Sequence, residues 1–334
     1  MKSKRFPEID TLYTLGTFLV IAGHSHSSDW SVFSGTVLTS IINFIYVFHM
    51  PLFFFVSGFL FINSNSLGKS GYGKWLKQKA LRLLTPYIVL SAVAIIPKYL
   101  LENRGFSGFT TKYLLEAILV PRIGVWGHFW FLPVLMLLYT AFGAWKKLLR
   151  KDTGNIVLFT ILVACVILYF LPYGTDWFGF NDFKKAALYF TSGMISNCFI
   201  KRHSNNKPRS VIRLFIIAVG LVSCILMTHF FSKNEFIMLL TALIMIYVCW
   251  QIASLVGENK LTHWICNNNF TIYIYSWPFQ ALTMAILEKL YFPWYVVTLC
   301  MFVVGITIPI LIILVYQKLQ RIHNRFFNLL LGIR

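Results

Sequence analysis

Long apolar runs recur along almost the whole chain, with only short polar segments between them. Each run is comparable with the roughly 20 residues that a helix needs to cross a bilayer. Because a backbone in lipid must satisfy its polar groups internally, such runs predict transmembrane helices. The predicted fold is all-α, a polytopic membrane bundle of about ten transmembrane helices in a single domain over residues 1–334. The candidate spans are 10–27, 37–63, 84–101, 125–145, 154–172, 185–200, 211–231, 235–256, 270–288 and 294–316.

The composition leaves little room for anything outside the membrane. Hydrophobic residues make up 57% of the chain and charged residues 12%, a balance that a soluble domain rarely shows. Ten spans of roughly 20 residues use about 200 positions, so the loops are short. Any chemistry is therefore expected among the helices or at their ends.

The basic residues are distributed unevenly between the two sides of the predicted bundle. With the N-terminus inside, 22 of the 30 lysines and arginines fall in cytoplasmic segments. Because cytoplasmic loops of membrane proteins are rich in Lys and Arg, this split predicts that both termini are cytoplasmic. The formal charge of +19 lies in short runs beside apolar segments, where it meets membrane lipids. No soluble module interleaves basic and aromatic residues, which excludes nucleic acid as a partner.

The sequence contains no pattern typical of a metal centre or a nucleotide-binding loop. None of the six cysteines forms a CxxC pair, and most lie inside apolar runs, as small buried side chains do. His24 and His26 are two residues apart, so a helix points them to different faces. No HExxH motif and no Gly-rich phosphate loop occurs in the sequence. We therefore expect no metal ligands and no bound cofactor.

Four polar residues of the first apolar run fall on one helical face, namely Asp10, Thr14, Thr17 and His24. In a membrane such a stripe faces the bundle interior or water, and its ionisable groups are functional candidates. A neutral His24 near the outer end can take a proton from a hydroxyl, or it is simply solvated at the headgroup level. Asp10 cannot orient His24, because 14 residues of helix span roughly 21 Å. A Ser-His-Asp triad built from this stripe is therefore excluded.

Two further histidines lie in apolar runs. His49 lies deep in the second run beside Pro51, where a buried imidazole needs a hydrogen-bond partner. It is either a site residue or a structural residue bonded to a carbonyl that the proline frees. His128 lies near the outer end of the fourth run, where it can orient an acceptor or His24. Trp130 beside it fits the same site or an interfacial aromatic belt.

The ninth apolar run contains aromatic and hydroxyl side chains where a proline bends the predicted helix. Tyr275 and Ser276 precede Pro278 in this run. Such side chains suit recognition of a polar substrate, and they suit helix–helix hydrogen bonding equally well. The sequence pattern does not decide between the two roles.

A basic amphipathic segment precedes the third apolar run on the cytoplasmic side. It contains Lys74, Lys77, Lys79 and Arg82, followed by Pro86. Such a cluster can bind the phosphates of a soluble donor. The alternative is a positive-inside anchor that contacts anionic lipid.

Four blocks of residues, in this order, carry a resemblance to a known family. The first block runs from residues 9–12 to residues 23–25, and the second from residues 48–54 to residues 57–58. The third is residues 128–132, and the fourth runs from residues 273–275 to residue 278. The chain resembles the membrane-bound acyltransferase-3 family, and within it the fucose 4-O-acetylase-like group. The blocks span nearly the whole chain, and the first two are fairly specific at this spacing.

The resemblance implies a ten-span acyltransferase-3-like core in a bacterial inner membrane. It implies acetyl-CoA or another acyl-CoA as the donor co-substrate on the cytoplasmic side, and a glycan or lipid-linked sugar as the acceptor. It also implies that His24 is the essential histidine, and Asp10 and Arg82 match family positions. The family usually has Arg or Lys eleven residues before that histidine, where this chain has Tyr13.

The predicted function is therefore transfer of an acyl group, most simply acetyl, to a sugar hydroxyl of a cell-envelope or exported glycan. Direct transfer and a covalent acetyl-histidine are both open. A polysaccharide transporter or a non-enzymatic component of envelope synthesis is the alternative, although no internal repeat of the transporter kind occurs in the sequence. The candidates are His24, His49 and Asp10 for catalysis, Arg82, Lys79 and Tyr13 for donor binding, and His128, Trp130, Tyr275 and Ser276 for substrate binding.

Reporter fusions test the predicted orientation. We expect fusions at Met1 and Arg334 to report the cytoplasm, because most Lys and Arg residues fall on that side. A fusion in the loop near Trp30 should report the periplasm. A periplasmic Arg334 would mean that the number of spans is odd and that the predicted depth of His128 is wrong.

Overall fold

The computed structural model describes residues 6–27, 34–63, 71–101, 111–124, 127–146, 154–172, 174–202, 210–318 and 328. Many of the basic residues on which the predicted orientation rests lie outside the described residues. They belong to segments 1–5, 64–70, 147–153, 203–209 and 319–327. The orientation of the chain therefore stays a prediction.

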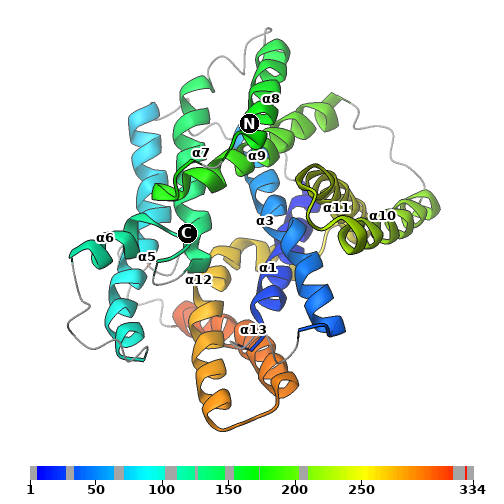
Figure 1. Ribbon diagram of the computed structural model, residues 1–334. Helices are drawn as coiled ribbons and strands as arrows, with labels where there is room; N and C mark the ends of the chain where they lie inside the picture. Colours follow the sequence, from blue (N-terminus) through cyan, green and yellow to red (C-terminus); the bar gives the residue numbers. More distant parts are fainter. Residues whose placement is uncertain are drawn as a thin grey trace. The chain divides into compact units, whose positions relative to one another are not determined.

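Helices account for nearly all the described residues, and no strand occurs among them (Figure 1). This confirms the all-α class. The long helices are α1 (Pro7–His24), α3 (Val37–Asn63), α5 (Tyr72–Leu101), α7 (Phe131–Trp145), α8 (Gly154–Phe170), α9 (Phe180–Arg202), α10 (Ser210–Phe231), α11 (Glu235–Val256), α12 (Lys260–Lys289) and α13 (Trp294–Lys318). The shorter elements are α6 (Thr111–Leu119) and the 3₁₀ helices η2 (Gly127–Trp130) and η4 (Trp177–Gly179).

Each predicted span falls on one of the long helices, but three helices begin several residues ahead of the predicted run. These are α5, α9 and α12, which begin at Tyr72, Phe180 and Lys260. The polar residues before each run continue the helix. Asn259 caps α12 by accepting a hydrogen bond from a first-turn amide at 2.7 Å. An apolar run marks the part of a helix that suits lipid, whereas capping groups decide where the helix begins.

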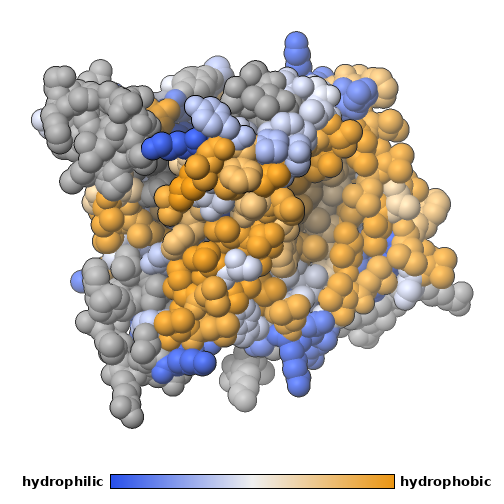
Figure 2. All heavy atoms as spheres, turned by 90° about the horizontal axis from the view of Figure 1, so that it is seen from below, coloured by the Kyte–Doolittle hydropathy of each residue, from blue (hydrophilic) through white to orange (hydrophobic). Residues whose placement is uncertain are grey.

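Within the part of the chain that the structure describes, six helices are long and apolar enough to cross a membrane by length and composition. They are α3, α5, α7 together with η2, α10, α11 and α13. The helix α8 is apolar but shorter. In Figure 2, hydrophobic residues cover most of the coloured part of the face drawn, as a lipid-facing surface requires. The multi-pass membrane class is supported, while the count of ten spans stays a prediction.

The chain divides into two compact units. The first unit contains residues 1–56 and 203–323, and the second contains residues 57–202 and 324–334. In the first unit, α12 packs along α1 and α13, α11 packs on α1, and α10 packs on α11. In the second unit, α7 packs on α5 and α9, and α8 packs on α9. The single domain over residues 1–334 stays a prediction.

Two glycines let α1 approach α3 within the first unit. Gly16 and Gly23 are seven residues apart and so lie on one face of α1. A Cβ atom at Gly16 would come within 3.0 Å of the Phe53 ring, and one at Gly23 within 3.0 Å of the Tyr46 ring. Small residues at a helix interface permit this close packing in membranes. The approach brings the Tyr46 side chain beside the last turn of α1.

A buried lysine supports the end of α3 in the second unit. Lys146 follows α7, and its Nζ donates to the Phe61 carbonyl at 2.5 Å. The same ammonium lies 4.3 Å from the centroid of the Phe61 ring. A cation is favourable beside the last carbonyls of a helix, where the helix dipole is negative. Lys146, the first residue after the predicted span 125–145, therefore supports a helix end from a buried position.

Gly58→Ala is expected to destabilise the protein, because a Cβ atom at Gly58 would overlap the Phe190 carbonyl oxygen of α9. Overpacking of this kind costs about 1–3 kcal/mol. Gly73→Ala is the matched control, since nothing lies within 4 Å of a Cβ atom built there. That change should be neutral or slightly stabilising. Thermal unfolding of both purified variants in one detergent is the measurement, and equal midpoints would contradict the packing of α3 on α9.

Candidate active site

His24 is the last residue of α1, where carbonyls lack partners within the helix. Tyr46 of α3 donates from Oη to the carbonyl of the residue before His24 at 2.7 Å. Ser25 Oγ donates to the Ile21 carbonyl at 2.7 Å, and Gln280 of α12 donates to the same carbonyl at 3.0 Å. The final turn that carries His24 is therefore held by both α3 and α12.

Aromatic and imidazole rings surround His24. Its ring centroid lies 5.3 Å from that of Trp277 on α12, in an edge-on arrangement. The Tyr46 and His49 rings of α3 lie at centroid distances of 5.9 and 6.5 Å from it. The structure thus brings together the two histidines that were predicted to be catalytic. It adds Trp277 and Tyr46, which were not predicted as site residues.

His49 has the hydrogen-bond partner that its burial requires. Its Nδ1 lies 2.8 Å from the Ile45 carbonyl, one turn earlier on α3. Because a carbonyl only accepts, Nδ1 carries the hydrogen and Nε2 is the acceptor nitrogen of the neutral ring. Pro51 frees the carbonyl of Val47 instead, so this partner differs from the one expected beside the proline. The bond gives His49 a structural role and fixes its tautomer, while its catalytic role stays a prediction.

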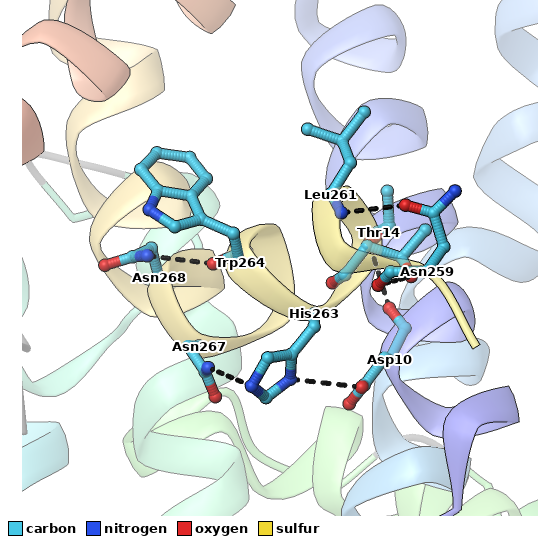
Figure 3. Close-up of polar contacts among 9 residues, drawn as sticks. Asp10, Thr14, Asn259, Leu261, His263, Trp264, Asn267 and Asn268 are labelled. Atoms are coloured by element: carbon cyan, nitrogen blue, oxygen red, sulfur yellow. Dashed lines mark hydrogen bonds and ion pairs between the residues drawn. The ribbon is translucent and has the colours of Figure 1, made fainter.

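Asp10 lies near the opposite end of α1 and pairs with a histidine of α12 (Figure 3). His263 Nδ1 is 3.2 Å from Asp10 Oδ2, and its Nε2 is 3.0 Å from the Asn267 amide nitrogen. In the neutral ring, Nδ1 donates to the carboxylate and Nε2 accepts from Asn267. Among the described residues, no group of three or more His, Cys, Asp or Glu side chains could hold a metal ion. Asp10 therefore has its own imidazole partner, and its catalytic role stays a prediction.

The threonines of the polar stripe bond to helix carbonyls. Thr14 Oγ1 donates to the Asp10 carbonyl at 2.9 Å and lies 3.3 Å from the Thr262 carbonyl of α12. Thr17 Oγ1 donates to the Tyr13 carbonyl at 2.8 Å. Asp10, Thr14 and Thr17 are buried, so this part of the stripe faces the interior as predicted. Of these two hydroxyl groups, that of Thr14 also contacts α12, whereas the hydrogen bond of Thr17 to the Tyr13 carbonyl stays within α1.

The three predicted donor-binding residues belong to different units. Tyr13 lies in the first unit, with its ring centroid 6.1 Å from that of Phe53. Lys79 and Arg82 belong to α5 in the second unit and, three residues apart, lie on one helical face. The Lys79 ammonium lies 4.6 Å from the centroid of the Tyr139 ring, a cation–π contact. The donor role of all three residues stays a prediction.

The predicted substrate residues of η2 also lie in the second unit. The Arg122 guanidinium contacts both carboxylate oxygens of Asp182, at 2.5–2.9 Å. The same guanidinium lies 4.2 Å from the centroid of the Trp130 ring. One face of Trp130 is therefore covered, which leaves at most the other face for a substrate. His128 packs edge-on against Phe129, with ring centroids 4.6 Å apart.

On α12, the contacts with α1 come from residues other than the predicted pair. Ser276 is buried and donates to a carbonyl of its own helix at 3.2 Å, and Tyr275 is half-buried. Trp277 and Gln280, three residues apart, contact α1. The sequence signal for them was a polar and aromatic stretch around Pro278, which did not indicate which side chains meet α1. The substrate role of Tyr275 and Ser276 stays a prediction.

Comparison with known proteins supports the resemblance carried by the sequence blocks. Residues 6–314 match the Acyl_transf_3 family model, an acyltransferase domain. No curated protein and no solved structure matches the chain. The match includes every residue of the cluster around His24, while the fucose 4-O-acetylase-like subgroup stays a prediction. The chain therefore belongs to the acyltransferase-3 family of membrane proteins.

Proposed function

We propose that the protein transfers an acyl group, most simply acetyl, from acyl-CoA to a hydroxyl of a cell-envelope or exported glycan. The observation that carries this proposal is the position of His24, held at the end of α1 among the rings of Trp277, Tyr46 and His49. An imidazole is the side chain best suited to move a proton near neutral pH. Membership of the acyltransferase-3 family supports acyl transfer as the reaction class.

The proposed reaction is a direct transfer with general-base catalysis by His24. The imidazole takes the proton of a sugar hydroxyl, and the oxygen attacks the carbonyl carbon of the thioester. A C–O bond forms, the C–S bond breaks, and the CoA sulfur leaves as a thiolate. The imidazolium then gives its proton to the thiolate, which regenerates neutral His24. General acid–base catalysis of this kind typically contributes about 10²–10⁴ in rate.

The rings around His24 suit binding of the acceptor. Trp277 and Tyr46 combine flat apolar surfaces with a polar edge, the mixture that small-molecule sites use to hold and orient a ligand. The Tyr46 hydroxyl donates to an α1 carbonyl at 2.7 Å and lies 3.4 Å from His26 Nε2, so these contacts hold the Tyr46 ring beside the last turn of α1. We assign the Trp277 and Tyr46 rings to contacts with the acceptor sugar.

The same proposal places the protein in a bacterial inner membrane, with acyl-CoA taken from the cytoplasm. A donor with several phosphates is attracted to basic side chains that can give charge-assisted hydrogen bonds. Lys79 and Arg82 share one face of α5, and the Tyr139 ring holds the Lys79 ammonium in place. We assign this face of α5 to the phosphates of the donor.

His24→Ala is expected to reduce acyl transfer about 10²–10⁴-fold while the protein still accumulates in the membrane. The reason is that an alanine cannot take the proton of the hydroxyl. His229→Ala is the matched control, because this exposed histidine lies on α10, which packs on α11. The measurement is glycan acetylation together with the membrane abundance of each variant. Full acetylation by His24→Ala at normal abundance would remove His24 from the mechanism.

Arg82→Ala is expected to raise the KM for acetyl-CoA about tenfold, because a hydrogen bond to a charged group contributes about 1.5–3 kcal/mol. Lys233→Ala is the matched control, because this exposed lysine lies between α10 and α11 and outside the basic segment of α5. Tyr13→Arg should be neutral or should lower the KM of the Arg82→Ala variant, since it restores the basic residue usual in the family. Acetyl-CoA is titrated against the single variants and the double variant. An unchanged KM in Arg82→Ala would contradict donor binding by α5.

A further inference from the structure

The side chain of Gln280 is buried between α1 and α13 in the first unit, with 1% of its surface exposed. Its amide nitrogen donates to the Ile21 carbonyl at 3.0 Å and to the Ser25 hydroxyl oxygen at 2.8 Å. Both acceptors belong to the last turn of α1 or to the residue that follows it. The two amide hydrogens of Gln280 are therefore both used on the segment that carries His24.

A glycine of α13 sets where this amide lies. A Cβ atom at Gly305 would come within 2.8 Å of Gln280 Cδ and within 2.9 Å of its Cγ and Nε2. Packed side chains do not tolerate such overlap, so a larger residue at position 305 would displace the amide. The backbone of α13 thus forms one wall of the site in which the Gln280 side chain sits.

The hydrogen bonds close a small network at the end of α1. Ser25 Oγ donates to the Ile21 carbonyl at 2.7 Å and accepts from Gln280. Ser25 has left the helix, with φ −88° and ψ 76°, so no further helical turn supports His24 from that side. Helix ends fray where few contacts hold them. The network therefore holds the last turn, and with it the place of the His24 ring beside Trp277.

We infer that Gln280, seated against Gly305, is a positioning residue for His24. The inference rests on the proposed function, in which His24 takes the proton of the hydroxyl. Gln280 acts through the backbone from which the imidazole projects and touches no reacting atom. A shift of about 1 Å in a catalytic group can cost roughly 10²-fold in rate. Donor binding is assigned to α5 and should not depend on this turn.

Two variants disturb the hydrogen bonds of the Gln280 amide in different ways. Gln280→Met keeps a side chain of similar length but removes both hydrogen bonds, and Gly305→Ala keeps the amide but crowds it. Both should reduce kcat about 10–100-fold, with the KM for acetyl-CoA within about twofold of wild type. Gly220→Ala is the matched control, because it crowds α10 against Val248 of α11, a contact that does not include α1. This control should lower the folded yield and leave kcat unchanged.

The rates are measured on the full chain in detergent, per folded molecule, with acetyl-CoA as donor and envelope membranes as acceptor. A double variant then separates positioning from general destabilisation. If Gln280 acts through His24, adding Gln280→Met to His24→Ala should not slow the residual reaction further.

Three results would overturn the inference. One is an unchanged kcat in both Gln280→Met and Gly305→Ala, which would indicate a purely structural role. Another is a further loss of activity in the double variant. Both of these leave the proposed function intact. The third is full activity of His24→Ala, which would overturn the proposed mechanism and this inference with it.

Discussion

Side-chain hydrogen bonds tie α1 to α12 near both ends of α1. At one end, His263 pairs with Asp10, and at the other, Gln280 donates to the last turn. The buried Gln280 amide has no water to replace a lost partner, so breaking its bonds leaves a buried group unsatisfied, whereas His263 is partly exposed. The two helices are therefore held in one register along their length. His24 takes its place in the cluster from that register.

The hydrogen bonds between α1 and α12 account for the polar side chains that make these two helices the more polar ones of the first unit. Both are at least 18 residues long, but neither is as apolar as a candidate membrane span, whereas α10, α11 and α13 are. Several of their polar side chains bond between the two helices, as those of His263 and Thr14 do. Polar and ionisable groups inside a membrane bundle are commonly functional. The proposed active site thus lies where the sequence is least typical of a lipid-facing helix.

Properties that belong to a single segment could be predicted from the sequence. Hydropathy located the long helices, and helical periodicity assigned the buried stripe of Asp10, Thr14 and Thr17 to one face. The rise of a helix per residue was enough to separate Asp10 from His24. The start of α12 was predicted too late, because its cap at Asn259 and the polar turns after it lie outside the apolar run.

Only the tertiary structure decided which side chains meet across helices. His263 is 253 positions from Asp10, and Gln280 is 255 positions from Ser25, so no periodicity within one segment links them. In a membrane, helix neighbours are selected by close packing of small residues and by interhelical hydrogen bonds, which the hydropathy of one segment does not encode. His24 could therefore be identified from its own helix and sequence block. The rings beside it and the amide that holds its turn depend on contacts between distant segments, which form only when the helices pack.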